Sequence, residues 1–268
     1  GQLGSGSFYM GSGVVKIGGW FSIGESNKYG GSGAATMSGG TLSVGGAFYV
    51  GFEGDGTMHL SGGNLSIASA LWIGCHYGDS GALTVSAGTL TVTSETNVGM
   101  NGTGSLQLNG GVAVFGGTLK VGQMGTSLPA QLCISNAIES AIVKQSLTIE
   151  SNGELTFDVN LSLPQKADPI ISANALNFNT SGQYAITLSN LDSVQTNRQI
   201  GIIESATVVD ADIKNITWQI DGITAGYDVQ AEWEDNTLYL NITVIPESSA
   251  TAALFGLLAL LVTARRKK

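Results

Sequence analysis

The 268-residue chain is poor in charge, proline and cysteine. Only 12% of its residues are charged, and it contains 4 prolines and 2 cysteines. A hydrophobic fraction of 43% with so little charge is the opposite of a disordered composition. Two cysteines, Cys75 and Cys133, supply neither a disulfide framework nor a zinc-site spacing. We therefore expect an ordered chain in which both cysteines are buried or half-buried thiols.

Basic residues are also scarce, with 11 against 20 acidic residues and a net charge of −9. Four of the 11 are the last four residues, Arg265, Arg266, Lys267 and Lys268. Nucleic acid binding depends on a basic footprint, so the composition argues against nucleic acid as a partner. The acidity by itself indicates only solubility.

Glycine is abundant, and 32 of the 39 glycines lie in residues 1–123. There a ten-residue pattern, G-x-G-x-φ-x-φ-S-G-G, recurs at intervals of 23 to 27 residues, where φ is an apolar residue. We call each copy a box. The five boxes are GSGSFYMGSG (4–13), GSGAATMSGG (31–40), GDGTMHLSGG (54–63), DSGALTVSAG (79–88) and GTGSLQLNGG (102–111). A repeat of this length, seen in several copies, is typical of solenoid proteins.

A β-branched residue followed by glycine comes ten residues after the end of every box. These pairs are Ile23-Gly24, Val50-Gly51, Ile73-Gly74, Val98-Gly99 and Val121-Gly122. Short runs of alternating apolar residues between the glycines predict three strands per repeat. Because the offset is constant, stacked repeats would bring like aliphatic residues into register. We expect three inward rows: Ile23, Val50, Ile73, Val98 and Val121; Val15, Leu42, Leu65 and Leu90; and Met10, Met37, Leu60, Val85 and Leu108.

The sequence therefore predicts an all-β fold, a parallel β-helix with rungs of about 23–27 residues. Right-handed connections are expected because parallel crossovers almost always have that hand. All variation in rung length falls between the β-branched–glycine pair and the next box, so the inserts project from one corner. Such loops often form the binding face of a solenoid. The candidate ligand-facing residues are Tyr29, Phe52, Glu53, His76 and Tyr77, with ordinary loop residues as the alternative.

Residues 124–244 are poorer in glycine but keep β character, and predict an irregular continuation of the helix followed by a β-rich cap. Segment 146–163 alternates around Asn152-Gly153, a dipeptide typical of hairpins. Further strands are expected at 183–191, 199–205 and 215–221. Residues 227–244 predict a hairpin around 234–236, with Val229, Ala231, Trp233, Leu238, Leu240 and Ile242 on one face. A cap is expected because an open solenoid end exposes unpaired strand edges.

The final segment, 245–268, has three parts. Ile245, Pro246 and Glu247 come first, an apolar run follows at 250–264, and the basic cluster 265–268 ends the chain. The 15-residue run is short for a membrane span, for which about 20 residues are usual. The basic cluster would remain cytoplasmic and leave the preceding residues outside the cell. The pattern predicts a short hydrophobic helix that holds the chain in the membrane.

This tail resembles the PEP-CTERM sorting signal of exported bacterial proteins, in which a Pro-Glu-Pro motif precedes a short hydrophobic helix and an arginine-rich end. Pro246 and Glu247 match the motif, and Ser248 stands where the family has its second proline. The boxes and β-branched–glycine pairs resemble autotransporter-associated β-strand repeats, which have a pectin-lyase-like β-helix. The resemblance implies an exported protein of the cell surface or extracellular matrix, an exosortase-type enzyme as partner, and placement alongside exopolysaccharide. It implies no catalytic residue.

The sequence offers no clear chemical site. Cleavage of a glycosidic bond typically needs two carboxylates about 5–10 Å apart, which in a solenoid means matching positions on neighbouring rungs. The acid and histidine side chains nearest to this arrangement differ in register: Asp55, His59, His76 and Asp79. No catalytic, metal or cofactor residue is therefore assigned. We expect a non-enzymatic, stalk- or adhesin-like surface protein, and the alternative is a polysaccharide-binding or polysaccharide-cleaving β-helix that uses the corner loops.

Overall fold

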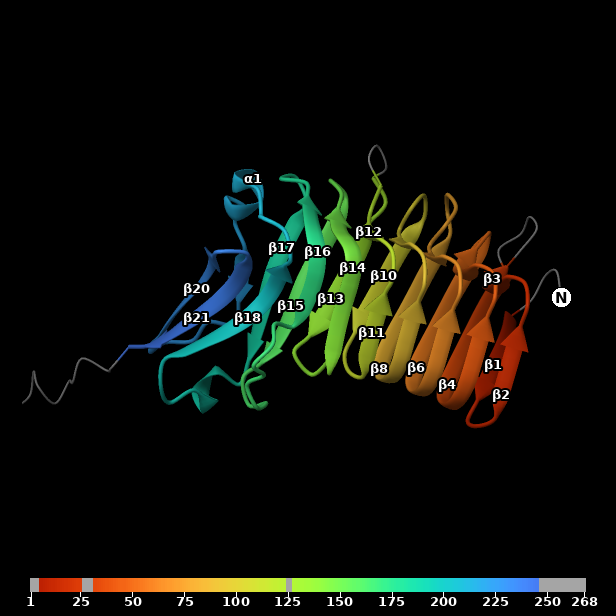
Figure 1. The fold of residues 1–268 in the computed structure, drawn as a ribbon, viewed down its shortest axis with the longest axis horizontal. Helices are drawn as coiled ribbons and strands as arrows, with labels where there is room; N and C mark the ends of the chain where they lie inside the picture. The colour runs from red at the N-terminus through yellow and green to blue at the C-terminus, as the bar shows by residue number, and fades with distance from the viewer. Residues whose placement is uncertain (1–4, 26–30, 124–126, 246–268) are drawn as a thin grey trace, which may run out of the picture.

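The computed structural model of the protein describes residues 5–25, 31–123 and 127–245. The fold is a parallel β-solenoid of about 7 turns, with about 25 residues per turn, 62% strand and 3% helix. Successive turns stack along the long axis of the molecule (Figure 1). The predicted all-β parallel helix is confirmed.

Each turn contributes strands to three faces. The first face contains β1 (Ser5–Met10), the first halves of β4 (Gly31–Val44), β6 (Gly54–Ile67) and β8 (Ser80–Val92), then β10 (Thr103–Leu108), β13 (Ala130–Ser135), β15 (Gly153–Asn160), β17 (Gln183–Ser189) and β19 (Gln219–Asp221). The second contains β2 (Val14–Ile17), the second halves of β4, β6 and β8, then β11 (Val112–Phe115), the first half of β14 (Ser140–Ile149), the first half of β16 (Ile171–Phe178) and β18 (Arg198–Ser205). The third contains β3 (Phe21–Glu25), β5 (Phe48–Phe52), β7 (Leu71–Ile73), β9 (Thr96–Val98), β12 (Leu119–Val121) and the second halves of β14 and β16.

The expectation of three short strands per rung is wrong for three of the five repeats, and β14 and β16 likewise each join the second and third faces. In β4, β6 and β8 the first and second faces belong to one strand of 13 or 14 residues, which bends at the end of the box. The bend is made by the last glycine of each box, with φ near +80° at Gly40, Gly63 and Gly88. Glycine adopts this left-handed conformation without a steric penalty, so pairing continues around the corner through a register irregularity.

The three predicted inward rows are confirmed by the pairing register. The row Met10, Met37, Leu60, Val85 and Leu108 continues through Ile134, Phe157 and Ile186. Most of these side chains are completely buried. Burial of apolar surface at ~25 cal/mol per Å² makes this continuous core the main stabilising contribution.

A glycine contact closes the corner at which each variable insert begins and ends. In the four pairs that are followed by another box, the glycine of the pair lies against the glycine at the third position of that box, at the corner between the third and first faces. A Cβ atom on Gly56 would lie 2.2 Å from the amide nitrogen of Gly51, and one on Gly104 would lie 2.1 Å from that of Gly99. Side chains at these positions would collide with backbone, so both glycines of each contact are required.

Parallel pairing extends past residue 123 as far as β19. The hairpin suggested by Asn152-Gly153 is not formed, because β14 and β15 pair with the strands of the preceding turn and not with each other. Here the dipeptide turns a solenoid corner. Segment 215–221 forms strand only at β19, after the one-turn helix α1 (Ala211–Lys214).

The β-rich cap is an antiparallel hairpin of β20 (Tyr227–Glu234) and β21 (Thr237–Val244), as predicted for 227–244. Its apolar face is the predicted one, with Val229 opposite Ile242, Ala231 opposite Leu240 and Trp233 opposite Leu238. β21 also pairs with β18 in the antiparallel sense, and so closes the second face of the solenoid.

Cys75 and Cys133 are free thiols, one buried and one half-buried, as expected. Within 5–25, 31–123 and 127–245, no helix is long and apolar enough to cross a membrane. The predicted hydrophobic helix and the sorting residues Pro246, Glu247, Arg265, Arg266, Lys267 and Lys268 lie outside the described residues. Ile245, the last described residue, is exposed, and its amide donates a hydrogen bond to the Gly226 carbonyl.

Candidate functional site

The predicted ligand-facing residues lie at the corner between the third and first faces. Phe52 ends β5, Glu53 connects β5 to β6, and His76 and Tyr77 lie in the loop between β7 and β8. Tyr29 lies outside the described residues. Because consecutive turns stack, the two described corner loops are neighbours, and the Phe52 and His76 rings meet edge to face with centroids 4.8 Å apart.

Asp79 holds these two loops together. Its Oδ2 accepts hydrogen bonds from the backbone amides of Glu53 (2.6 Å) and His76 (3.3 Å). Glu53 has a φ of +58°, a conformation that a non-glycine residue adopts only where surrounding contacts impose it. Burial raises the pKa of the Asp79 carboxyl, while the two amide bonds and the nearby His76 oppose that rise. The Asp79 carboxylate therefore has a structural role, because it joins the loop at Glu53 to the loop at His76.

The four side chains nearest to a catalytic arrangement do not form one site. His59 lies on the outward side of the first face, opposite Thr36 and Thr84, and its Nε2 is 2.8 Å from the Ser86 hydroxyl. Asp55 lies opposite Ser32 and is exposed. Only His76 and Asp79 are neighbours, and Asp79 contacts the backbone of His76.

Cys75 in the same loop is a poor nucleophile. Burial, followed by the nearby Asp79 charge, raises the pKa of its thiol to about 11. The thiol therefore stays protonated at neutral pH, whereas both nucleophilic attack and metal ligation need the thiolate.

Two substitutions at Asp79 test its structural role. Asp79→Ala leaves the Glu53 and His76 amides without their acceptor, and should lower the free energy of unfolding by about 1–3 kcal/mol. Asp79→Asn keeps an acceptor oxygen and removes the charge that burial disfavours, so we expect a change below about 1 kcal/mol. Urea denaturation measures both. An equal loss in the two variants would contradict this role and point to the charge itself.

The structure also reveals an outward row on the third face that the sequence reasoning missed. Strand pairing places seven residues in line, one from each successive turn. We call this the third-face row: Ser22, Tyr49, Trp72, Asn97, Lys120, Thr148 and Asn177. In the first five turns each member directly precedes a β-branched–glycine pair, so the sequence did contain a signal.

One end of the third-face row is aromatic. Tyr49 and Trp72 lie opposite each other on β5 and β7, and both are half-buried. Trp20, 55% exposed, contacts Tyr49 edge to face at 6.4 Å. Phe52 packs against Tyr49 from the corner side, with ring centroids 4.6 Å apart. Phe52 at the corner therefore packs against the aromatic end of the third-face row.

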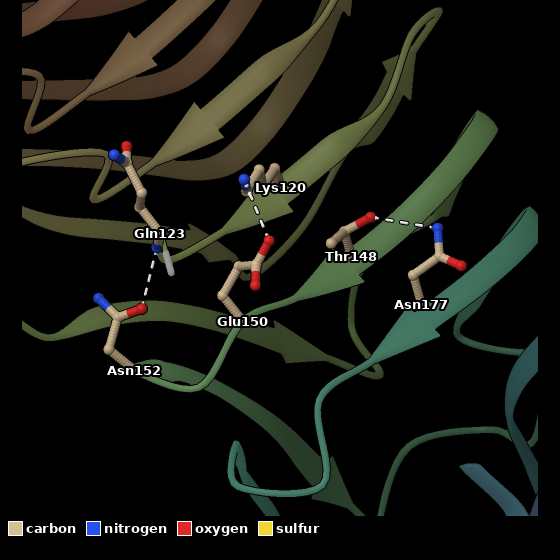
Figure 2. A network of polar contacts seen from close by, with 6 residues as sticks. All are labelled: Lys120, Gln123, Thr148, Glu150, Asn152 and Asn177. Carbon is tan, nitrogen blue, oxygen red and sulfur yellow. Dashed lines mark hydrogen bonds and ion pairs between the residues drawn. The ribbon is translucent and has the colours of Figure 1, made fainter. Parts of the chain in front are cut away.

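The other end of the row is polar. Figure 2 shows Lys120 facing Glu150, with 3.0 Å between Nζ and Oε1, and Thr148 beside Asn177. In the same view the Asn152 Oδ1 accepts a hydrogen bond from the backbone amide of Gln123 at 2.9 Å. An open hollow of about 550 Å³ adjoins this end of the third-face row. It is lined by Thr148, Glu150, Asn177, Asn179, Asp210 and Asp212, with the apolar residues Leu176 and Phe178.

Asn97 lies between these two ends and is only 8% exposed. Its neighbours in the row, Trp72 and Lys120, both have longer side chains. Among the described residues, the Asn97 Nδ2 has no hydrogen-bond partner. A buried donor without an acceptor costs about 1–3 kcal/mol, so it marks a place where a partner atom is expected.

Fold and surface together define the protein as a parallel β-solenoid with a continuous apolar core and, on its third face, a mixed aromatic and polar outer row. No protein-family model matches the chain, and no curated protein matches it.

Proposed function

We propose that the protein is a non-enzymatic component of the bacterial cell surface or extracellular matrix, exported and sorted by its C-terminal segment. The observation that carries the proposal is the solenoid itself, an elongated body with continuous apolar inward rows from turn to turn (Figure 1). A body of this kind suits a stalk or adhesin, because it spans distance with a repeated unit and offers long outer faces.

The sorting part of the proposal depends on the sequence of the tail. Ile245, Pro246 and Glu247, the apolar run at 250–264 and the basic cluster 265–268 form the pattern that an exosortase-type enzyme would process at the membrane. The basic cluster would keep the extreme C-terminus cytoplasmic while the solenoid lies outside the cell. Exopolysaccharide of the matrix is the partner that this placement makes available.

The test is fractionation of bacteria that carry an exosortase-type enzyme. We expect the full chain in the cell envelope or at the cell surface, and a chain ending at Val244 in the medium. Immunoblotting of each fraction makes the comparison. If both chains partition alike, the tail is not a sorting device and the proposal fails.

A matched variant separates anchoring from sorting. Replacing Pro246 and Glu247 with alanine leaves the apolar run and the basic cluster intact. We expect this variant to accumulate in the cytoplasmic membrane at its unprocessed mass, because it retains the anchor but lacks the motif. Normal surface delivery of the variant would refute the role of these two residues.

A further inference from the structure

We propose that the third-face row is a binding surface for an extended, uncharged β-1,4-linked glycan, which would lie across the strands along the solenoid axis. The inference rests on the proposed function only in supposing that the folded solenoid meets glycans outside the cell.

The spacing of the row matches that of an extended glycan. Parallel strands are about 4.8 Å apart, so the part of the row from Tyr49 to Asn177 is about 24 Å long and presents a new side chain at each step. An extended β-1,4-linked glycan repeats its pyranose rings at a similar interval. With one ring per strand, the row accommodates about six rings.

The side chains of the row suit the chemistry of pyranose rings. Pyranose rings have an apolar face and a polar rim, so they need aromatic surface and hydrogen-bonding groups side by side. Tyr49 and Trp72 supply half-buried aromatic surface, and the exposed Trp20 extends it. Toward the hollow, Thr148 and Asn177 supply hydroxyl and amide groups. Their mutual contact of 3.5 Å is long, so a better-placed sugar hydroxyl would replace it at little cost.

The side-chain amide of Asn97 is unsatisfied among the described residues. Its Nδ2 lies midway along the row, buried and without an acceptor among the described residues. We expect a sugar hydroxyl to reach it when the side chains of its two neighbours in the row, Trp72 and Lys120, shift. Lys120 is 35% exposed and forms an ion pair with Glu150, whose side chain is 14% exposed, and the flexible lysine stem can shift while its ammonium keeps this pair. The free protein therefore carries a cost that ligand binding removes.

Charge selects the class of glycan. The one cation in the row, Lys120, is neutralised by Glu150, and the hollow also carries Asp210 and Asp212. A polyuronate chain would bring further negative charges beside these carboxylates, which is unfavourable. An uncharged chain carries no such penalty.

The test uses the purified full-length chain with cellohexaose, xylohexaose and chitohexaose, and with hexagalacturonate as the charged counterpart. Calorimetry and tryptophan fluorescence should detect binding of at least one uncharged hexamer, and weaker or no binding of hexagalacturonate. Trp72→Ala should weaken that binding about tenfold, because it removes the central aromatic surface. Tyr9→Ala, on the first face and 72% exposed, is the matched aromatic control and should leave the affinity unchanged.

Asn97→Ala provides a readout that a purely structural residue would not give. It should weaken binding about fivefold and leave the midpoint of urea denaturation unchanged or higher, because a buried unsatisfied donor is removed. Failure of all three uncharged hexamers to bind, tighter binding of hexagalacturonate, or equal affinity of the wild type and Trp72→Ala would overturn the proposal. None of these outcomes depends on where the protein is sorted in the cell.

Discussion

The substitution Gly81→Ala is expected to lower the free energy of unfolding by about 3 kcal/mol or more, although it adds a single methyl group. A Cβ on Gly81 would lie 2.1 Å from the Val50 carbonyl oxygen and 2.3 Å from the Gly74 amide nitrogen. Both atoms belong to backbone held by ladder hydrogen bonds, so neither can move without breaking the stack. The urea denaturation midpoint should fall well below that of the wild type.

Gly6→Ala is the matched control for this prediction. Gly6 occupies the same box position on β1, yet among the described residues nothing lies within 4 Å of a Cβ placed there. We expect a change within about 0.5 kcal/mol, since a surface substitution without contacts is usually neutral. Similar losses in the two variants would mean that backbone entropy, and not the corner contact, makes glycine necessary.

Truncation of Phe115 to alanine should have the second large effect, a loss of about 3–5 kcal/mol. Phe115 is among the largest side chains that are completely buried, and it stacks between Val92 of the turn before and Val143 of the turn after. Its removal leaves a cavity that rigid neighbouring strands cannot fill. Chemical denaturation followed by circular dichroism measures the loss.

The control is Phe115→Leu, which keeps most of the volume and should cost less than about 1.5 kcal/mol. A solenoid is stabilised by contacts between neighbouring turns, so a cavity in a middle turn also weakens the coupling between the two ends. The alanine variant should therefore unfold over a broader denaturant range than the leucine variant. Equal stabilities of the two would contradict the packing account.

The spacing of the repeats made the inward-facing residues predictable from the sequence. The constant offset between box and β-branched–glycine pair placed Ile23, Val50 and Ile73 in one row, because a parallel stack admits no other register. The outer side escaped prediction, because residues in the third-face row change type at every turn. Tyr49, Trp72 and Asn97 share only a position, and that position becomes a surface only when the strands align.

Of the two hairpins predicted from turn residues, one forms and one does not. The hairpin around 234–236 forms as predicted, because its two strands pair with each other in the cap. Asn152-Gly153 has the same local preference, but the strands on either side of it already have partners one turn away. Of the candidate corner residues, Glu53, His76 and Tyr77 lie in loops, Phe52 is the last residue of β5, and Tyr29 lies outside the described residues. The role of Asp79 depends on an amide contributed by another turn, which sequence spacing alone does not show.

The cap has a consequence for fibre growth. Parallel solenoids are templates, and an open last turn would accept a strand from another molecule, as the ends of amyloid fibrils do. Here the second face ends in an antiparallel hairpin whose outermost strand, β20, carries Asp228, Glu232 and Glu234. The first face ends in β19, which is only three residues long. At the second face, an incoming parallel strand would meet a strand of the hairpin and its negative charges. At the first face, it would meet only three residues with which to pair. This end of the molecule therefore resists polymerisation even at high local concentration.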